Sequence, residues 1–159
     1  MKGLVCAGKK IHEILLDVEN VGVKDIAAKF VQECQLMSNL HHPNITQFLG
    51  VCFLPNSQLP VLVMERLDGS LDDLLETVPN IPVILKRSIL ADIASGLLYL
   101  HTHTPQIIHR DLTAKNVLLT SSFVAKITDL GNSRIVNICL LYTSPSPRDA
   151  TLSRMPSSA

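Results

Sequence analysis

The strongest constraint on this chain is a pair of short motifs in its second half. Residues 109–116 have the sequence His-Arg-Asp-Leu-Thr-Ala-Lys-Asn, and residues 129–131 have the sequence Asp-Leu-Gly. The intervening residues form two short apolar runs around a polar turn, which predicts a strand, a turn and a second strand. An ordinary β-hairpin that follows a helix is one interpretation of this pattern. The alternative is that the polar residues beside the hairpin, Asp111, Asn116 and Asp129, carry out chemistry.

These motifs resemble the catalytic loop and the metal-binding Asp-Phe-Gly element of the eukaryotic protein kinases, with Leu130 in place of Phe. A chance match at all the specified positions is on the order of one in a billion per starting point. The resemblance implies phosphoryl transfer from ATP with Mg²⁺, which requires mainly positioning and charge neutralisation. Asp111 is then expected to orient the substrate hydroxyl and accept its proton. Asn116 and Asp129 offer hard oxygen ligands that suit Mg²⁺.

Two basic residues of the same loop receive roles from the resemblance. Lys115 lies four residues after Asp111, where tyrosine kinases often carry a cation, and is expected to stabilise the transferring phosphate. Serine/threonine kinases usually carry a lysine two residues after this aspartate, and Thr113 occupies that position here. Arg110 resembles the arginine of kinases that are switched on when it pairs with an activation-loop phosphate.

The segment 61–75 predicts a strand, a charged turn and a short helix. Ser70 and Asp73 have the spacing of a capping box, so the helix is expected to begin at Ser70. A plain core strand and a capped helix would explain the pattern, but next to the catalytic loop it resembles the kinase hinge that holds adenine. That resemblance makes Met64 the gatekeeper, assigns the backbone of Glu65 and Leu67 to the adenine edge, and places Ser70 near the ribose.

Residues 24–39 predict an amphipathic helix with apolar residues at three- and four-residue steps. Glu33 occupies the position of the conserved helix glutamate of kinases, although a solvated carboxylate is the ordinary interpretation. Its expected partner is Lys9, in a strand that resembles the Val-Ala-x-Lys pattern through Ala7. Lys10 is the competing candidate, but it is one residue out of register and would point to the opposite strand face.

Further residues match kinase positions that ordinary core packing would also explain. Four fit the buried stack that aligns the two kinase lobes: Met37, Phe48, His109 and Leu130. Two others, Ala7 and Leu118, are expected to clamp adenine from above and below. Residues 88–101 form an apolar stripe and predict a long helix just before the catalytic loop.

Composition is consistent with these expectations. The 159 residues include 14 Lys+Arg and 14 Asp+Glu, so overall charge provides no attraction to nucleic acid or anionic membranes. No apolar run approaches the roughly 20 residues that span a bilayer, and the first residues do not resemble a signal peptide. The four cysteines lack paired short spacing, which predicts buried free thiols in a reducing compartment. We therefore expect a cytoplasmic domain, which can also be part of a larger or membrane protein.

The expected fold is α+β, a partial protein-kinase-like bilobal fold. The N-lobe part is expected over about residues 1–64, the hinge over 65–69 and the C-lobe part over 70–138. No glycine-rich loop precedes Lys9, and no Ala-Pro-Glu element follows Gly131. Residues 139–159 resemble translated sequencing-adapter DNA, which predicts a non-native tail; a disordered Ser/Pro-rich tail is the alternative.

The expected function of the parent domain is transfer of the ATP γ-phosphate to a Ser/Thr or Tyr hydroxyl of a protein substrate in signal transduction. The 159-residue chain itself is expected to show no measurable transfer. A pseudokinase that serves as a binding or scaffold module is the alternative, because Leu130 replaces Phe and the glycine-rich loop is missing. The motifs resemble tyrosine and tyrosine-kinase-like enzymes and slightly favour serine/threonine or dual action.

Overall fold

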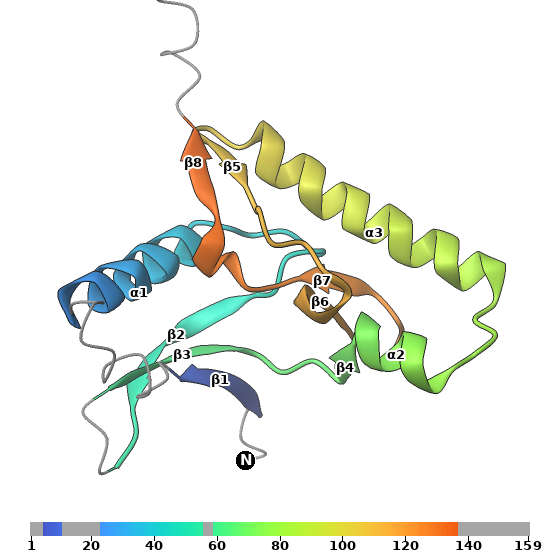
Figure 1. Ribbon diagram of the computed structural model, residues 1–159, viewed down its shortest axis with the longest axis horizontal. Helices are drawn as coiled ribbons and strands as arrows, with labels where there is room; N and C mark the ends of the chain where they lie inside the picture. Colours follow the sequence, from blue (N-terminus) through green and yellow to red (C-terminus); the bar gives the residue numbers. More distant parts are fainter. Residues whose placement is uncertain (1–4, 11–22, 56–58, 137–159) are drawn as a thin grey trace, which may run out of the picture.

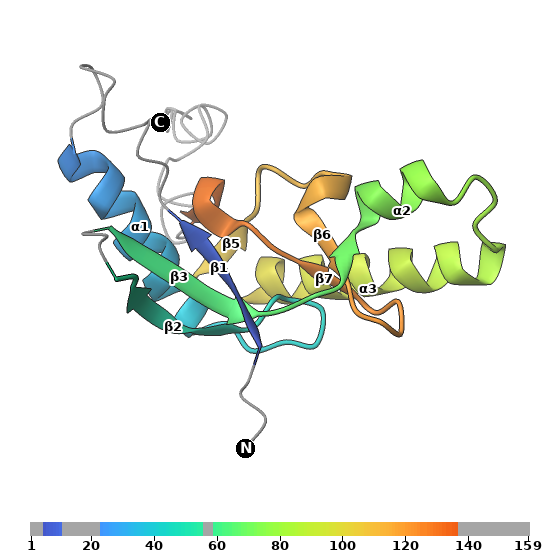
Figure 2. The ribbon, with the colours of Figure 1, turned by 90° about the horizontal axis from the view of Figure 1, so that it is seen from below.

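The computed structural model describes residues 5–10, 23–55 and 59–136 (Figure 1). The predicted tail from residue 139 and the region before Val5 lie outside the described residues. Within the described ranges the chain is α+β, as expected. A sheet with one helix packed on it forms the first part, and two helices with short strand pairs form the second (Figures 1 and 2).

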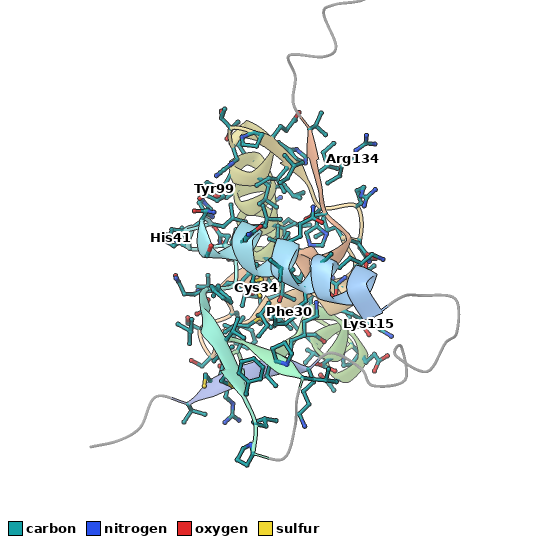
Figure 3. All side chains as sticks on the ribbon, turned by 90° about the vertical axis from the view of Figure 1, so that its left-hand side faces the viewer. Phe30, Cys34, His41, Tyr99, Lys115 and Arg134 are labelled. Atoms are coloured by element: carbon teal, nitrogen blue, oxygen red, sulfur yellow. The ribbon has the colours of Figure 1, made fainter. Side chains whose placement is uncertain are left out.

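The sheet of the first part is antiparallel, with the strand order β1-β3-β2. Strand β1 spans Cys6–Lys10, β2 spans Phe48–Phe53 and β3 spans Pro60–Glu65. The central strand β3 is mostly aliphatic, and its Leu62 is completely buried. Helix α1 spans Val23–Ser38, within one residue of the prediction at each end. Its Phe30, Cys34 and Met37 belong to the core packing, and Figure 3 shows the helix from its outer side.

The apolar residues 45–53 predict a strand that starts at Ile45, whereas strand β2 begins three residues later. Ile45 instead forms an isolated parallel bridge with Ile127. The β2–β3 register shifts between Phe48 and Gly50, where Gly50 has φ 151°, a backbone angle that favours glycine. The apolar run therefore contains two structures, a bridge and then a bulged strand, which alternation alone did not separate.

The second part begins with β4 at Gly69–Ser70, α2 at Leu71–Thr77 and α3 at Val83–Thr102. It continues with β5 (Gln106–Ile108), a 3₁₀ turn (Ala114–Asn116), β6 (Val117–Leu119), β7 (Ala125–Ile127), a second 3₁₀ turn (Leu130–Asn132) and β8 (Arg134–Val136). Strands β4, β6 and β7 form one antiparallel sheet, and β5 pairs with β8.

Helix α3 starts five residues before the predicted Ser88. Its first turn follows Pro82 and exposes Ile84 (83%), so apolar periodicity did not mark the start. Ile89 and Leu100 are buried as the predicted stripe requires. Leu90 and Leu98 are each 64% exposed on the other side of the helix. The helix is thus covered by the described residues on one side only, which leaves a wide apolar surface.

One hydrophobic core joins the two parts. Its buried members come from α1, the α1–β2 connection, β3, α3, β5, β7 and the turn after β7: Met37, Leu40, Ile45, Leu62, Leu100, Ile107, Ile127 and Leu130. A second cluster lies under α2 and α3 and contains Ile89, Val117, Leu119 and Ala125. Because the larger cluster draws on both parts, burial of apolar surface holds them together.

The α1–β2 connection is fastened to the second part by backbone hydrogen bonds. Thr46 N–H donates to the carbonyl of Ile127 (2.9 Å), and Ile127 N–H donates to the carbonyl of Asn44 (2.9 Å). The side chain of Asn44 also donates to the carbonyl of Ala125 (3.0 Å). At the end of α1, His41 N–H donates to the hydroxyl of Tyr99 in α3 (3.0 Å; Figure 3). These bonds fasten the connection to the second part at residues 41–46, before it joins its own sheet at β2.

The described cysteines Cys6, Cys34 and Cys52 are free thiols, but Cys6 and Cys52 are exposed rather than buried as predicted. Both lie on outer strands of the small sheet, where one face is open. None of the helices in the described ranges combines the length and the apolar character needed to cross a bilayer. The lobe and hinge boundaries remain predictions.

We expect Gly96→Ala to destabilise the fold. A Cβ atom at this position would lie 2.8 Å from the Asn44 carbonyl oxygen and 3.0 Å from Cδ1 of Ile127. Alanine favours a helix over glycine by about 1 kcal/mol, whereas overpacking costs roughly 1–3 kcal/mol. The net loss should appear in denaturant unfolding curves. Ser95→Ala, at an exposed neighbouring position, is the control and should be close to neutral; an equally stable Gly96→Ala variant would contradict the tight contact.

Candidate active site

The ammonium group of Lys9 lies between two carboxylates. Its Nζ is 2.8 Å from Oε1 of Glu33 and 2.8 Å from Oδ1 of Asp129, with a hydrogen bond to each. The Glu33 side chain is 9% exposed, whereas those of Lys9 and Asp129 are each 37% exposed. The structure thus brings together three residues that the sequence placed in one site, from β1, α1 and the turn after β7.

Local sequence explains why Lys9 rather than Lys10 reaches this position. In β1, Ala7 lies opposite Met64 and Lys9 lies opposite Leu62, so both share the core-facing side of the sheet. Lys10 points to the other face and is exposed. Glu33 is three residues after Phe30 and four residues before Met37 in α1, so it shares the core-facing side of the helix with them.

Asp129 has a left-handed backbone conformation, with φ 60° and ψ 72°. This region is uncommon for residues other than glycine and carries a strain of order 1–3 kcal/mol. The conformation places Oδ1 so that it accepts from Gly131 N–H (3.3 Å) as well as from Lys9. Among the described residues no group donates to Oδ2 of Asp129, so this oxygen is available to a ligand.

Charge interactions within the triad shift two pKa values in opposite directions. Burial by itself would lower the pKa of Lys9, but the hydrogen bonds and charges of Asp129 and Glu33 outweigh it and raise that pKa above 10.5. Burial by itself would raise the pKa of Asp129, but Lys9, Gly131 N–H and His109 together hold it below 3.8. Both groups are therefore charged at neutral pH.

The catalytic-loop motif forms a hydrogen-bonded loop next to Asp129. Arg110 has a positive φ of 66°, and its Nε donates to the carbonyl of Asn132 (2.7 Å). The amide nitrogen of Asn116 donates to the carbonyl of Asp111 (2.7 Å), which leaves its Oδ1 free of hydrogen bonds from the described residues. Asn132 donates to Oδ2 of Asp111 (3.2 Å). The loop and the Asp-Leu-Gly turn therefore hold each other in place.

His109 is 2% exposed and connects the catalytic loop to the segment that precedes Asp129. Its Nδ1 accepts from Asp111 N–H (3.3 Å), so Nε2 carries the proton and donates to the carbonyl of Thr128 (2.9 Å). Met37 and Leu130 are buried in the large core, and Phe48 packs against it. The four residues of the predicted lobe-aligning stack are therefore core residues near the interface between the two parts.

The predicted adenine residues lie along the segment that links the two parts. Met64 is the penultimate residue of β3, opposite Ala7, and its Sδ is 3.9 Å from the hydroxyl of Thr128. Leu118 lies in β6 opposite Ser70. Leu67 follows β3, and its backbone groups make no hydrogen bond with the described residues. These residues therefore occupy adjacent strands and the connection between them.

Ser70 and Lys115 have other partners in the structure. Ser70 caps α2 as predicted: its Oγ accepts from Asp73 N–H (3.1 Å) and donates to Oδ2 of Asp73 (2.6 Å). The hydrogen bonds that Ser70 Oγ–H and Ser70 N–H donate to Oδ2 of Asp73 lower the pKa of that carboxyl group. Nζ of Lys115 lies 3.9 Å from Oδ2 of Asp72 in α2, and the side chain is 79% exposed. Lys115 is therefore not drawn into the group formed by Asp111, Asn116 and Asp129.

Two further residues belong to the site without having been predicted: Asn132 contacts the carboxylate of Asp111, and Lys126 pairs with Glu65. Asn132 directly follows the Asp-Leu-Gly motif, and that position was the available signal. Lys126 lies on a short strand of mostly apolar residues, and nothing in that pattern indicates that its side chain forms an ion pair. The predicted role of Glu65 involved only its backbone, whereas its side chain also makes an ion pair.

Asn116 and Asp129 each offer an oxygen atom of the kind that Mg²⁺ prefers, and the hydrogen bond from Thr128 N–H to the Asn116 carbonyl (3.0 Å) brings their two segments together. Oδ1 of Asn116 and Oδ2 of Asp129 are hard ligands, and Mg²⁺ usually takes only one or two protein ligands when phosphate oxygens and waters complete its shell. Within the described ranges no three His, Cys, Asp or Glu side chains form a group that could hold a metal. The donors therefore fit a metal that arrives with a phosphate ligand.

Comparison with known families agrees with this geometry. Residues 8–151 match the family model for protein tyrosine and serine/threonine kinases. The chain belongs to the protein kinase family. The bilobal α+β architecture and the phosphotransferase family expected from the motifs are thereby confirmed, and the family implies the use of ATP, typically with Mg²⁺.

Individual kinases resemble this kinase domain over most of its length. A probable serine/threonine-protein kinase of Dictyostelium discoideum is 37% identical over 86% of the chain, and the probable serine/threonine-protein kinase drkC of the same organism is 40% identical over 83%. The dual specificity protein kinase shkA is 36% identical over 67%. The chain spans only 13%, 17% and 20% of these relatives, respectively.

The shifted pKa values predict how stability depends on pH. Folding lowers the pKa of Asp129, so its contribution to stability is present above 3.8 and is lost as the pH falls through the lower folded-state pKa. Folding raises the pKa of Lys9, so its contribution is present below 10.5 and is lost as the pH rises through the higher folded-state pKa. The combined contribution should be constant between these limits.

Denaturant unfolding at a series of pH values tests the acid limb. Below pH 3.8, the free energy of unfolding should fall less steeply with decreasing pH in Asp129→Asn than in the unmodified chain. The difference in slope should be at most about that caused by the binding of one proton. Asp68→Asn is the matched control, because Asp68 is exposed and its side chain makes no bond with the described residues. An identical acid slope in Asp129→Asn and the unmodified chain would refute the assignment.

Proposed function

We propose that the protein containing this chain is an ATP- and Mg²⁺-dependent protein kinase that acts on serine or threonine hydroxyls of a protein substrate. The observation that carries this proposal is the Lys9 ammonium, held at 2.8 Å from both Glu33 and Asp129. An ammonium fixed by a buried glutamate is a preorganised cation for phosphate oxygens, and Asp129 beside it offers a metal ligand.

Each residue has a distinct role in this proposal. Lys9 binds the α- and β-phosphates, and Glu33 keeps its ammonium in place. Asn116 and Asp129 hold Mg²⁺, which neutralises phosphate charge when bound. Met64, Ala7 and Leu118 surround the adenine, and the backbone of Glu65 and Leu67 binds its edge. The Ser70 hydroxyl, already engaged in the helix cap, reaches the ribose as a second hydrogen-bonding partner.

Asp111 is the proposed base. Its backbone is fixed by Asn116 and His109, and Asn132 holds one carboxylate oxygen. The other oxygen, Oδ1, makes no hydrogen bond with the described residues and can accept the proton of a substrate hydroxyl. Arg110 is placed to pair with a phosphate on a downstream segment. Lys115 reaches the transferring phosphate only after it leaves Asp72.

Serine/threonine action is favoured over tyrosine action by the relatives. Two of those described above are named serine/threonine-protein kinases, and the third is named a dual specificity kinase. We also place the kinase in the cytoplasm, in a signalling pathway. Failure of the protein to bind nucleotide would favour a scaffold function instead.

Nucleotide binding is the first test. ATP·Mg²⁺ binding, measured by calorimetry, should weaken roughly tenfold or more in Lys9→Met, because the phosphates lose their fixed cation. Lys10→Met removes the same charge from the opposite strand face and should leave the affinity unchanged. Asp129→Asn should remove the Mg²⁺ dependence of binding. Equal losses in Lys9→Met and Lys10→Met would show that the Lys9 site is not the phosphate site.

Phosphoryl transfer is the second test, and it uses the full-length protein that contains this chain. Asp111→Asn should lower kcat about 10²–10⁴-fold, because the substrate hydroxyl loses its proton acceptor, while KM for ATP stays near its original value. Glu76→Gln, at an exposed carboxylate in α2, is the control and should retain activity. A variant at residue 111 with unchanged kcat would remove Asp111 from the mechanism.

A further inference from the structure

A second ion pair lies outside the Lys9 triad and joins the two parts of the domain. Nζ of Lys126 is 2.7 Å from Oε1 and 2.9 Å from Oε2 of Glu65. Only 16% of the Lys126 side chain and 26% of the Glu65 side chain are exposed. A pair with both partners largely withdrawn from water is less screened than a surface pair, so it can influence geometry.

Glu65 is also bound to a third segment, the α1–β2 connection. Its Oε1 accepts from Gln47 N–H (2.7 Å), and its own backbone N–H donates to the carbonyl of Gln47 (3.0 Å). The carboxylate therefore receives a charged donor and a backbone donor on one oxygen, and the charged donor on the other. Such charge-assisted bonds are short and directional, so they fix the end of β3 relative to both neighbours.

These bonds connect the two ends of the proposed nucleotide site. Glu65 is the last residue of β3 and the first of the hinge, whose backbone faces the adenine. Lys126 lies in β7, three residues before Asp129, at the phosphate end. Ile127, which lies between Lys126 and Asp129 in the sequence, is hydrogen-bonded through both its N–H and its carbonyl to the Asn44–Thr46 segment. The distance between the hinge and Asp129 therefore depends on a short, bonded path through Glu65 and Lys126.

The Glu65–Lys126 ion pair coexists with the arrangement of the site that is proposed to bind phosphate. Lys9 is bonded to Glu33 in the same structure, and Met37 and Leu130 are packed in the core. The Glu65–Lys126 contact is thus compatible with the geometry that binds phosphate. This coexistence favours a role in forming the site over a role in keeping it apart.

We infer that Glu65 and Lys126 are positioning residues that set the distance between the adenine end and the phosphate end of the nucleotide site. The inference rests on the proposed function and adds that nucleotide binding requires this ion pair. A site whose two ends are already at the correct separation avoids part of the ordering cost of binding. The benefit applies to a ligand that spans both ends, ATP·Mg²⁺, and not to adenosine, which occupies one end.

The test compares the two ligands in the same variants of the full-length protein that contains this chain. Lys126→Met should weaken ATP·Mg²⁺ binding roughly tenfold and change adenosine affinity by less than about twofold. Lys126→Arg keeps the charge and should recover most of the ATP·Mg²⁺ affinity. Lys86→Met removes a lysine from the exposed side of α3 and should leave both affinities unchanged. Thermal unfolding of every variant reports whether the fold is retained.

Glu65→Gln provides a second approach if Lys126→Met does not fold. It removes the charge but keeps an acceptor for Gln47 N–H, and it should also weaken ATP·Mg²⁺ selectively. Equal losses for ATP·Mg²⁺ and adenosine, no loss for either, or tighter ATP·Mg²⁺ binding would each overturn the inference. Those outcomes leave the proposed function intact if the unmodified full-length protein binds ATP·Mg²⁺. Failure of the unmodified full-length protein to bind would overturn both.

Discussion

Two carboxylates, those of Glu33 and Asp129, share one ammonium group, and the placement of three separate elements depends on it. Without Lys9 the two negative charges would repel each other in a partly buried site, where the repulsion is weakly screened. With Lys9 present, β1, α1 and the turn after β7 are drawn to one point. The strained backbone of Asp129 is tolerated because its carboxylate is bonded to Lys9 and Gly131.

The second constraint is mechanical and involves the backbone. The Asn44–Thr46 segment continues from α1 but is bonded to β7, so the helix that carries Glu33 is tied to the strand that leads to Asp129. Gly96 permits the close approach of α3 to the same segment. The distance between Glu33 and Asp129 is therefore limited before any ligand binds. Lys9 therefore completes a site in which Glu33 and Asp129 are already held near each other.

Much of this arrangement was predictable from local sequence. Strand alternation separated Lys9 from Lys10 through Ala7, and the Ser70–Asp73 spacing located the start of α2. The start of α3 was not predictable, because its first turn exposes apolar residues. The exposed face of that helix shows the same limit: periodicity identifies a stripe but not which side is covered. The predicted helix boundary was therefore wrong where apolar residues are exposed in the structure.

Contacts between residues distant in sequence were beyond local patterns. Lys126 and Glu65 are 61 positions apart, and neither has a neighbour that indicates the other. The partner of Lys115 is also set by tertiary structure, because Asp72 is in α2 and lies near the loop only after folding. A motif therefore predicted which residues belong to the site, whereas the fold decided where each side chain points.

The charge balance of the proposed site favours a nucleotide that arrives with a divalent cation. Lys9 faces two carboxylates, and Asp111 adds a third on the adjoining loop, while the Lys115 charge is directed towards Asp72. A site with more negative than positive groups repels a polyphosphate, so the cation on Lys9 is insufficient by itself. In the proposed function, the free oxygens of Asn116 and Asp129 would convert that excess of negative charge into affinity for a divalent cation. The same carboxylates that would oppose the binding of a bare nucleotide would then favour the binding of a nucleotide that carries Mg²⁺.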